Sequence, residues 1–274
     1  MAGWPAHVID TGGDLPPLVL VHGILVSSRS FRHNIEPLSR AFRVIAPCQK
    51  GHGHSGRGPD PYDLASLSRF VVGVLDHLGI DRAHFAGNSL GGAVSARIAL
   101  DHPSRVDRLV LINPAARPFA APVEAFLRLQ GPVLTPLYRA VGQEATYRTF
   151  LRSLVYGNLS TIDTAYMAEF MAHVRTPGTV AAAATIAGQL PRELDALWPR
   201  LRGLSQATLL VWGQKDRIVP LRHGVALAQQ LPNARLEILP HVGHAPHEEH
   251  PARFNALVTD FLSRQIPRAR HPGG

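Results

Sequence analysis

The chain has 274 residues, 45% of them hydrophobic and 18% charged, a composition that excludes a mainly disordered protein and is compatible with one large α/β domain. Cys48 is the only cysteine, which excludes an intrachain disulfide framework and a cysteine-based zinc site. The net charge of +8 comes from scattered arginines and not from a basic run, so we expect no nucleic-acid partner.

The N-terminal segment Met1–Asp10 lacks the basic and apolar regions of a signal peptide. No apolar run reaches the roughly 18 residues that a membrane span needs. We therefore expect a cytoplasmic protein that does not associate with membranes. The sequence leaves open whether the protein is a monomer or a homodimer.

Short apolar runs bounded by Gly, Pro or Asp alternate with longer amphipathic segments along most of the chain. This alternation predicts a mostly parallel sheet with helices on both faces. The predicted strands are His7–Asp10, Leu18–Val21, Arg43–Ala46, Ala83–Ala86, Arg108–Ile112, Ala207–Trp212 and Arg235–Leu239. Helices are predicted over Leu64–Leu78 and Ser89–Leu100, and from Pro251 onward.

The alternation is interrupted from Asn113 to Gln206, where no strand is predicted and short helices are separated by Pro and Gly, including Pro191. An insertion of this length favours a helical cap or lid over the site, although a few peripheral packing helices would fit the same pattern. We expect residues 1–113 and 201–266 to form the core domain, 114–200 the cap and 267–274 a disordered tail.

The segment Gly87-Asn88-Ser89-Leu90-Gly91 has the pattern G-x-S-x-G between a predicted strand and a predicted helix. That context is typical of a tight turn that presents a nucleophilic serine, and glycines are needed there because a Cβ would clash. The turn would place the Ser89 hydroxyl at a helix N-terminus, where the helix dipole favours developing negative charge. The pattern predicts Ser89 as a nucleophile.

A serine hydroxyl needs a base to remove its proton. His244 follows the last predicted strand, and Asp216 follows the strand before it. The chain order Ser89, Asp216, His244 is typical of one specific fold, and all three residues follow strand ends at which open α/β sheets place their sites. The order predicts a triad in which His244 is the base and Asp216 orients it.

Together these motifs resemble an α/β-hydrolase with a helical cap, over nearly the whole chain. The resemblance implies an eight-stranded, mostly parallel sheet flanked by helices, with the all-helical cap inserted between strands 6 and 7. It also rests on His22-Gly23, Gly51-His52-Gly53-His54-Ser55, Trp212-Gly213-Gln214-Lys215-Asp216 and Gly243-His244-Ala245-Pro246.

The same resemblance implies an oxyanion hole made by the backbone N–H groups of Ile24 and Leu90. His22 is expected to brace that loop by hydrogen bonds. One position departs from the family pattern, because Cys48 stands where many relatives carry an Asp before the G-x-G-x-S loop. Cys48 is not expected to be a nucleophile, since no base motif matches it.

Four histidines recur at every third position, which raises the question of a metal site. Gly243 and Pro246 disfavour a continuous helix across them, and no carboxylate motif accompanies them. We therefore expect neither a metal nor a cofactor. The four are His241, His244, His247 and His250.

We expect an esterase that cleaves a small, largely apolar substrate through an acyl-enzyme on Ser89. Candidate pocket residues are His22, Met167, Phe170 and Met171, although the methionines could instead pack the cap onto itself. Alternatives on the same triad are a C–C bond hydrolase of the meta-cleavage type, a thioesterase or lactonase, and a perhydrolase. Family C–C hydrolases usually carry Trp where this chain has Ala245. A non-catalytic ligand-binding protein is a further alternative.

Overall fold

The computed structural model describes residues 5–58, 61–117, 142–157, 161–162 and 164–264. Within them the chain forms a seven-stranded sheet in the order β1-β3-β2-β4-β5-β6-β7. Only β1 runs antiparallel, to β3, and the remaining pairs are parallel. The strands are β1 (Val8–Asp10), β2 (Pro17–Val21), β3 (Arg43–Pro47), β4 (Ala83–Asn88), β5 (Val106–Ile112), β6 (Ala207–Gly213) and β7 (Ala234–Leu239).

Each strand coincides with a predicted one to within two residues at either end. The expected count of eight strands is nevertheless wrong for the described residues, in which the insertion follows the fifth strand, β5, and not the sixth. The reason is that only seven segments have the apolar pattern of a strand, and the eighth was implied by the family resemblance alone.

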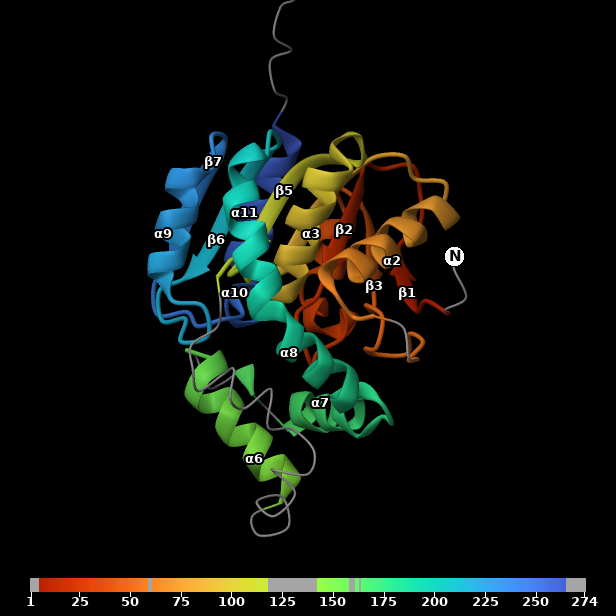
Figure 1. Cartoon of the computed structure of the whole chain (residues 1–274), viewed down its shortest axis with the longest axis vertical. Coiled ribbons are helices and arrows are strands. Elements are labelled where there is room, and N and C mark those ends of the chain that lie inside the picture. The colour runs from red at the N-terminus through yellow and green to blue at the C-terminus, as the bar shows by residue number, and fades with distance from the viewer. Residues whose placement is uncertain (1–4, 59–60, 118–141, 158–160, 163, 265–274) are drawn as a thin grey trace, which may run out of the picture.

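Helices cover both faces of the sheet (Figure 1). Along β2, Leu18 and Leu20 join one hydrophobic cluster while Val19 and Val21 join the other, as the two-residue period of a doubly covered strand requires. One cluster includes α1 (Ile35–Ser39) and α11 (Pro251–Ser263), and the other includes α2 (Leu64–His77), α3 (Leu90–Asp101) and α9 (Leu221–Gln230). Shorter helices are η1 (Ser28–Phe31), η2 (Pro103–Arg105), η5 (Trp198–Gly203) and α10 (Pro246–Glu249).

The insertion between β5 and β6 is helical in its described part. It contains α6 (Gln143–Phe150), the π-helix η3 (Leu151–Val155), α7 (Thr164–Arg175) and α8 (Thr179–Leu197). Figure 1 shows α6 and α7 beyond one end of the sheet, with α8 returning toward it. Residues 118–141 of the predicted cap and the tail 267–274 lie outside the described residues, so the domain boundaries stay a prediction.

Helix α8 corrects one expectation, because it continues through Pro191, where the sequence suggested a break. Proline removes one backbone donor from a helix and crowds the preceding turn. An apolar face that is buried on both sides of Pro191, including Ile186, Leu190 and Leu194, compensates for that loss. None of the described helices is both long and apolar enough to cross a membrane.

Candidate active site

Ser89 lies in the tight turn that joins β4 to α3, with φ of 53°, a value that a residue with a side chain rarely adopts. The flanking glycines allow this turn. A Cβ on Gly87 would overlap the backbone of Gly91, and a Cβ on Gly91 would overlap the carbonyl of Val21. The strained turn thus depends on both glycines of the motif, as the sequence predicted.

His244 and Asp216 form a buried pair next to this turn. Asp216 follows β6 and His244 follows β7, and the Nδ1–H of His244 donates to Asp216 Oδ2 over 2.7 Å. The other carboxylate oxygen of Asp216 accepts from the backbone N–H groups of Ile218 and Val219, at 2.7 and 2.9 Å. These bonds fix the carboxylate and leave Nε2 of His244 as the proton acceptor.

Asn113 adds a further contact to this pair. It follows β5, and its side-chain amide donates to Asp216 Oδ2, while its Oδ1 accepts from Gly213 N. Asn113 is fully buried and has φ of 41°. It therefore supports the acid residue from the end of the neighbouring strand.

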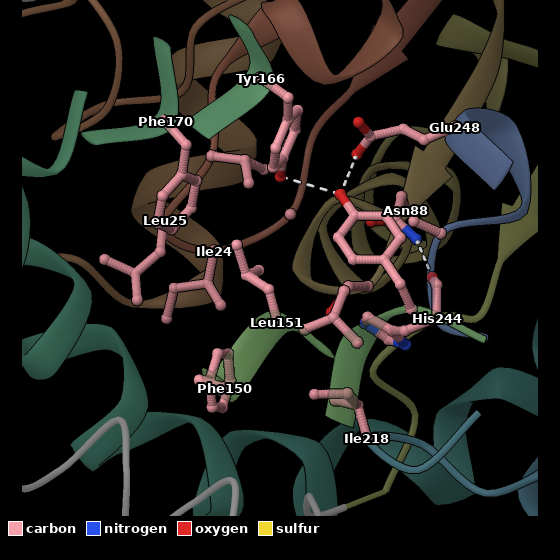
Figure 2. A pocket seen from close by; sticks show the side chains of 16 residues that line it. Ile24, Leu25, Asn88, Phe150, Leu151, Tyr166, Phe170, Ile218, His244 and Glu248 are labelled. Carbon is pink, nitrogen blue, oxygen red and sulfur yellow. Dashed lines mark hydrogen bonds between the residues drawn. The ribbon is translucent and has the colours of Figure 1, made fainter. Parts of the chain in front are cut away.

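Ser89 and His244 line one cavity of about 70 Å³ at the carboxyl ends of the strands. Figure 2 shows how the side chains of the core and of the insertion meet around it. Most of the wall is apolar, and no lysine or arginine is among the described residues that line it. The apolar side chains include Ile24, Leu25, Phe150, Leu151, Phe170 and Ile218.

The loop after β2 passes close to the nucleophile turn. A Cβ on Gly23 would lie 3.2 Å from Asn88 Oδ1 and 3.4 Å from Ser89 Cβ, and Ile24 lines the cavity. Leu90, fully buried, is the first residue of α3. This proximity is compatible with an oxyanion hole made by the N–H groups of Ile24 and Leu90.

His22 stabilises the loop after β2 by hydrogen bonds. The N–H of Gln49 donates to His22 Nε2 over 2.8 Å, so Nδ1 carries the proton and donates to Gly23 O over 2.7 Å. Burial and the nearby His52 lower the pKa of His22 well below its usual range, which keeps the ring neutral.

Of the four residues that the sequence suggested for the pocket, the structure places one in the cavity wall. Phe170 lines the cavity, whereas His22, Met167 and Met171 are not among its lining residues. Both methionines are at most 1% exposed and pack within the hydrophobic cluster. The helix α7 turns Tyr166 and Phe170 toward the cavity instead, because these two residues lie one turn apart on a neighbouring stripe.

The sequence did not reveal three polar residues in the cavity wall. Tyr156 Oη lies 2.8 Å from Tyr166 Oη and 3.1 Å from Glu248 Oε1, and Glu248 Oε2 accepts from Arg32 Nη1 over 2.6 Å. Burial raises the pKa of both tyrosines, which keeps them neutral. Burial also raises the pKa of Glu248, although the Arg32 charge opposes the shift.

The loop that carries His244 is anchored to the insertion. The N–H of His244 donates to Val155 O over 2.6 Å. Glu249 Oε2 accepts from Gly157 N over 2.8 Å, and its Oε1 accepts from Gly243 N over 2.9 Å. A Cβ on Gly243 would overlap backbone atoms of Val155 and Gly157. The backbones of the insertion and of the histidine loop are therefore in direct contact.

The other histidines of the periodic run have no shared site. His247 is fully buried between the rings of Phe31 and Phe254, and burial lowers its pKa to about 3. Among the described residues, no group of three or more His, Cys, Asp or Glu side chains is arranged to hold a metal ion.

Cys48, which stands where many relatives carry an Asp, packs closely against the loop that follows it. A Cβ on Gly53 would overlap the Cys48 sulfur, and Ser28 Oγ lies 3.2 Å from that sulfur. Ser55 Oγ donates to Cys48 O over 2.6 Å. The loop is thus held by a backbone carbonyl and close packing around the thiol.

Similarity to known proteins agrees with this geometry. A family model described as alpha/beta hydrolase fold matches residues 16–251. A 2-hydroxymuconate semialdehyde hydrolase from Pseudomonas sp. (strain CF600) is 32% identical over 96% of this chain and 92% of its own. A solved meta-cleavage product hydrolase from Pseudomonas fluorescens IP01 superposes with a TM-score of 0.84 and 27% identity, over 95% of both chains. A thermophilic esterase from Thermogutta terrifontis gives 0.78 and 25% identity, over 94% of this chain and 92% of the esterase.

Proposed function

The chain belongs to the alpha/beta hydrolase fold family, and from that membership we propose that this hydrolase cleaves the carbon–carbon bond of a vinylogous diketone at Ser89. The choice of bond rests on one observation, the 32% identity to a 2-hydroxymuconate semialdehyde hydrolase over 96% of this chain. It replaces the carboxylic ester that the sequence favoured.

The proposed reaction begins with a proton transfer. His244 Nε2 takes the proton of the Ser89 hydroxyl while the oxygen attacks the ketone carbon of the substrate. Asp216 holds the Nδ1–H of His244 over 2.7 Å and stabilises the imidazolium that forms. The N–H groups of Ile24 and Leu90 would stabilise the oxyanion.

The carbon–carbon bond becomes breakable once the dienol of the substrate has tautomerised to its diketo form, because the hydroxyl proton then moves to the carbon next to the scissile carbonyl and a second, conjugated carbonyl arises. When the tetrahedral intermediate collapses, the electron pair of that bond moves into the conjugated carbonyl as an enolate, and the imidazolium of His244 gives this enolate its proton and becomes neutral again. The acyl group stays on Ser89. Water, deprotonated by His244, then releases it as a carboxylic acid, so each turnover consumes one water.

An ester hydrolase is the second candidate. It is favoured by Ala245, which stands where the family resemblance implies a tryptophan in C–C hydrolases, and by the apolar cavity wall. An alkoxide leaving group needs only a proton from His244 and no conjugated carbonyl. The thermophilic esterase among the solved structures shares the fold at a TM-score of 0.78.

A substrate panel with matched variants tests the proposal. We expect the purified protein to hydrolyse 2-hydroxy-6-oxohepta-2,4-dienoate, whose scissile carbonyl is a ketone, with a higher kcat/KM than nitrophenyl acetate, the ester with the same acyl group. Ser89→Ala should abolish both activities with an unchanged melting temperature, because only the nucleophile is lost. Tyr62→Phe, which removes a hydroxyl outside this cavity, serves as the control.

The other outcomes separate the alternatives. Turnover of the ester alone would identify an ester hydrolase. If neither substrate turns over and a fluorophosphonate fails to label Ser89, the protein is not a serine hydrolase.

A further inference from the structure

The sheet ends at β7, whose outer edge is long and regular. Among the residues that the structure describes, no strand pairs with that edge. Figure 1 shows β7 and β1 at opposite ends of the sheet. β1 has only three residues, whereas β7 pairs with β6 over six consecutive residues without a bulge. An edge strand of this length presents a row of backbone groups to which another strand can bind.

Asn233 and Leu239 show which backbone groups of β7 are directed outward. Their carbonyls accept from backbone N–H groups of β6 and of the residue after it, over 2.9 and 3.0 Å. Backbone groups alternate in direction along a strand, so the odd-numbered residues of β7 turn theirs toward β6. The even-numbered residues therefore turn their N–H and C=O groups to the open edge, and these residues are Ala234, Leu236 and Ile238.

The side chains of β7 carry opposite charges on one face and apolar groups on the other. Arg235 Nε lies 2.9 Å from Glu237 Oε1, and the two side chains are 41% and 28% exposed. On the other face, Ala234 and Leu236 pack against a hydrophobic cluster, while Ile238 is 42% exposed. The strand therefore carries one positive charge, one negative charge and one uncovered apolar side chain.

An antiparallel pairing about a two-fold axis at Leu236 suits all of these groups. Leu236 then lies opposite the same residue of a second copy, and Ala234 lies opposite Ile238. The outward backbone groups of these residues face each other, so each opposing pair exchanges both of its N–H···O bonds. Arg235 lies opposite Glu237 in the closer, non-hydrogen-bonded position, where opposite charges are stabilising.

The other registers do not match the charges. An axis at Arg235 would place two arginines opposite each other, and an axis at Glu237 would place two glutamates, both of which are destabilising. An axis at Ala234 or Ile238 would shorten the paired segment and separate the arginine from the glutamate. Charges of a single sign would protect an edge strand from a second copy, whereas this pair of charges selects one register.

We propose that the outer edge of β7 binds a second copy of this chain, antiparallel and with the two-fold axis at Leu236. The sheets of the two copies then continue into each other. A second copy supplies the complementary pattern by symmetry, because the arginine of each strand meets the glutamate of the other. The inference does not depend on which bond the hydrolase cleaves.

Charge reversals test this interface. We expect the full chain to sediment as a dimer whose fraction rises with protein concentration. Arg235→Glu and Glu237→Arg should each raise the dissociation constant by about tenfold or more, because each places like charges opposite each other on both sides of the axis. Arg40→Glu, which reverses one charge of the exposed ion pair with Glu36 beside α1, is the matched control and should leave the dimer unchanged.

A mixture of the two reversed chains separates a contact between chains from a contact within one chain. The Arg235→Glu chain has two acidic side chains at these positions and the Glu237→Arg chain has two basic ones, so neither regains the ion pair within its own strand. In a mixed dimer, each acidic side chain lies opposite a basic one. We expect the mixture to form a heterodimer about as tightly as the unmodified chain forms its dimer. A role in folding alone would leave the mixture monomeric.

Disulfide crosslinking measures the same register and carries the test if the reversed chains do not fold. Directly opposite residues in non-hydrogen-bonded positions have Cα atoms about 4.5 Å apart, a separation that a disulfide can span. Under mild oxidation, an Arg235→Cys chain mixed with a Glu237→Cys chain should form linked dimers faster than either chain alone. Cys48, the only other cysteine, is buried.

Three results would overturn the inference. A chain that stays monomeric up to its solubility limit would show that the edge does not bind a second copy. A dimer that persists in both single reversals would place the interface elsewhere on the molecule. Mixed chains that neither associate nor crosslink would contradict the antiparallel register.

Discussion

Asp216 is held at both of its oxygens, by Ile218 and Val219 at one and by Asn113 and His244 at the other. We predict that Asp216→Asn lowers kcat by a factor on the order of 10⁴, because an amide in that place cannot hold the Nδ1–H tautomer of His244. Steady-state kinetics measure this, and an unchanged melting temperature would show that the fold is intact. A loss of tenfold or less would mean that another group orients His244.

The sequence could predict that the three proposed catalytic residues lie close together, but not how the rest of the cavity is built. Ser89, Asp216 and His244 each follow a strand end, so a strand pattern and a chain order suffice to group them. Met167 and Tyr166 are adjacent on one helix, and periodicity predicts an apolar stripe without saying which edge of it meets the cavity. Tyr156 and Glu248 come from elements whose approach is set only by tertiary packing.

At the scale of elements, the backbone of η3 lies against the loop that carries His244 so closely that a Cβ on Gly243 would have no room. We predict that Gly243→Ala destabilises the fold by about 1–3 kcal/mol, because the added Cβ overlaps the backbone of Val155 and Gly157. Since His244 is the next residue, kcat should fall on the order of 10²-fold. Urea unfolding and steady-state kinetics measure the two effects.

Gly188→Ala is the matched control for that substitution. Gly188 lies in α8, and apart from its chain neighbours and the adjoining turns of its own helix nothing lies within 4 Å of the position that a Cβ would take. Alanine should therefore stabilise the protein by about 0.5–1 kcal/mol and leave kcat unchanged. If both alanine variants behaved alike, the contact of the histidine loop with η3 would have no special role.

The elements themselves were largely readable from the sequence, because both faces of the sheet are covered and its strands are short apolar runs. Two failures have physical reasons. A helix continues through Pro191 because its buried face outweighs a local preference. The polar contact of Glu249 with Gly157 joins residues 92 positions apart along the chain, and local patterns carry no information about such a contact.

At the scale of the whole molecule, several buried histidines predict a loss of stability in mild acid. Burial lowers the pKa of His52 to about 4 and that of His173 and His247 to about 3, from a usual value of about 6.5. The unfolded chain therefore binds more protons below pH 6.5. The contribution to stability is complete above that pH and is lost as the pH falls toward 4 and 3.

We expect the free energy of unfolding to fall between pH 6.5 and 5 by up to roughly 1 kcal/mol per pH unit for each of these histidines. Urea titrations at several pH values measure this slope. His247→Phe, which places another ring between Phe31 and Phe254, should make the slope shallower. A slope that is flat above pH 5 in the unmodified protein would contradict this explanation.

The hydrogen bond from His244 to Val155 has a consequence for protein engineering. A helical insertion is an obvious unit to exchange between relatives when a new specificity is sought. Here the backbone of the proposed base, His244, is held in part by that insertion. Where the insertion meets the histidine loop, neither Gly157 nor Gly243 has room for a Cβ. A chimera that receives the insertion of a relative must therefore receive the matching histidine loop of that relative as well. The exchanged unit should include both contacting segments, and it should not be chosen from the ends of the strands alone.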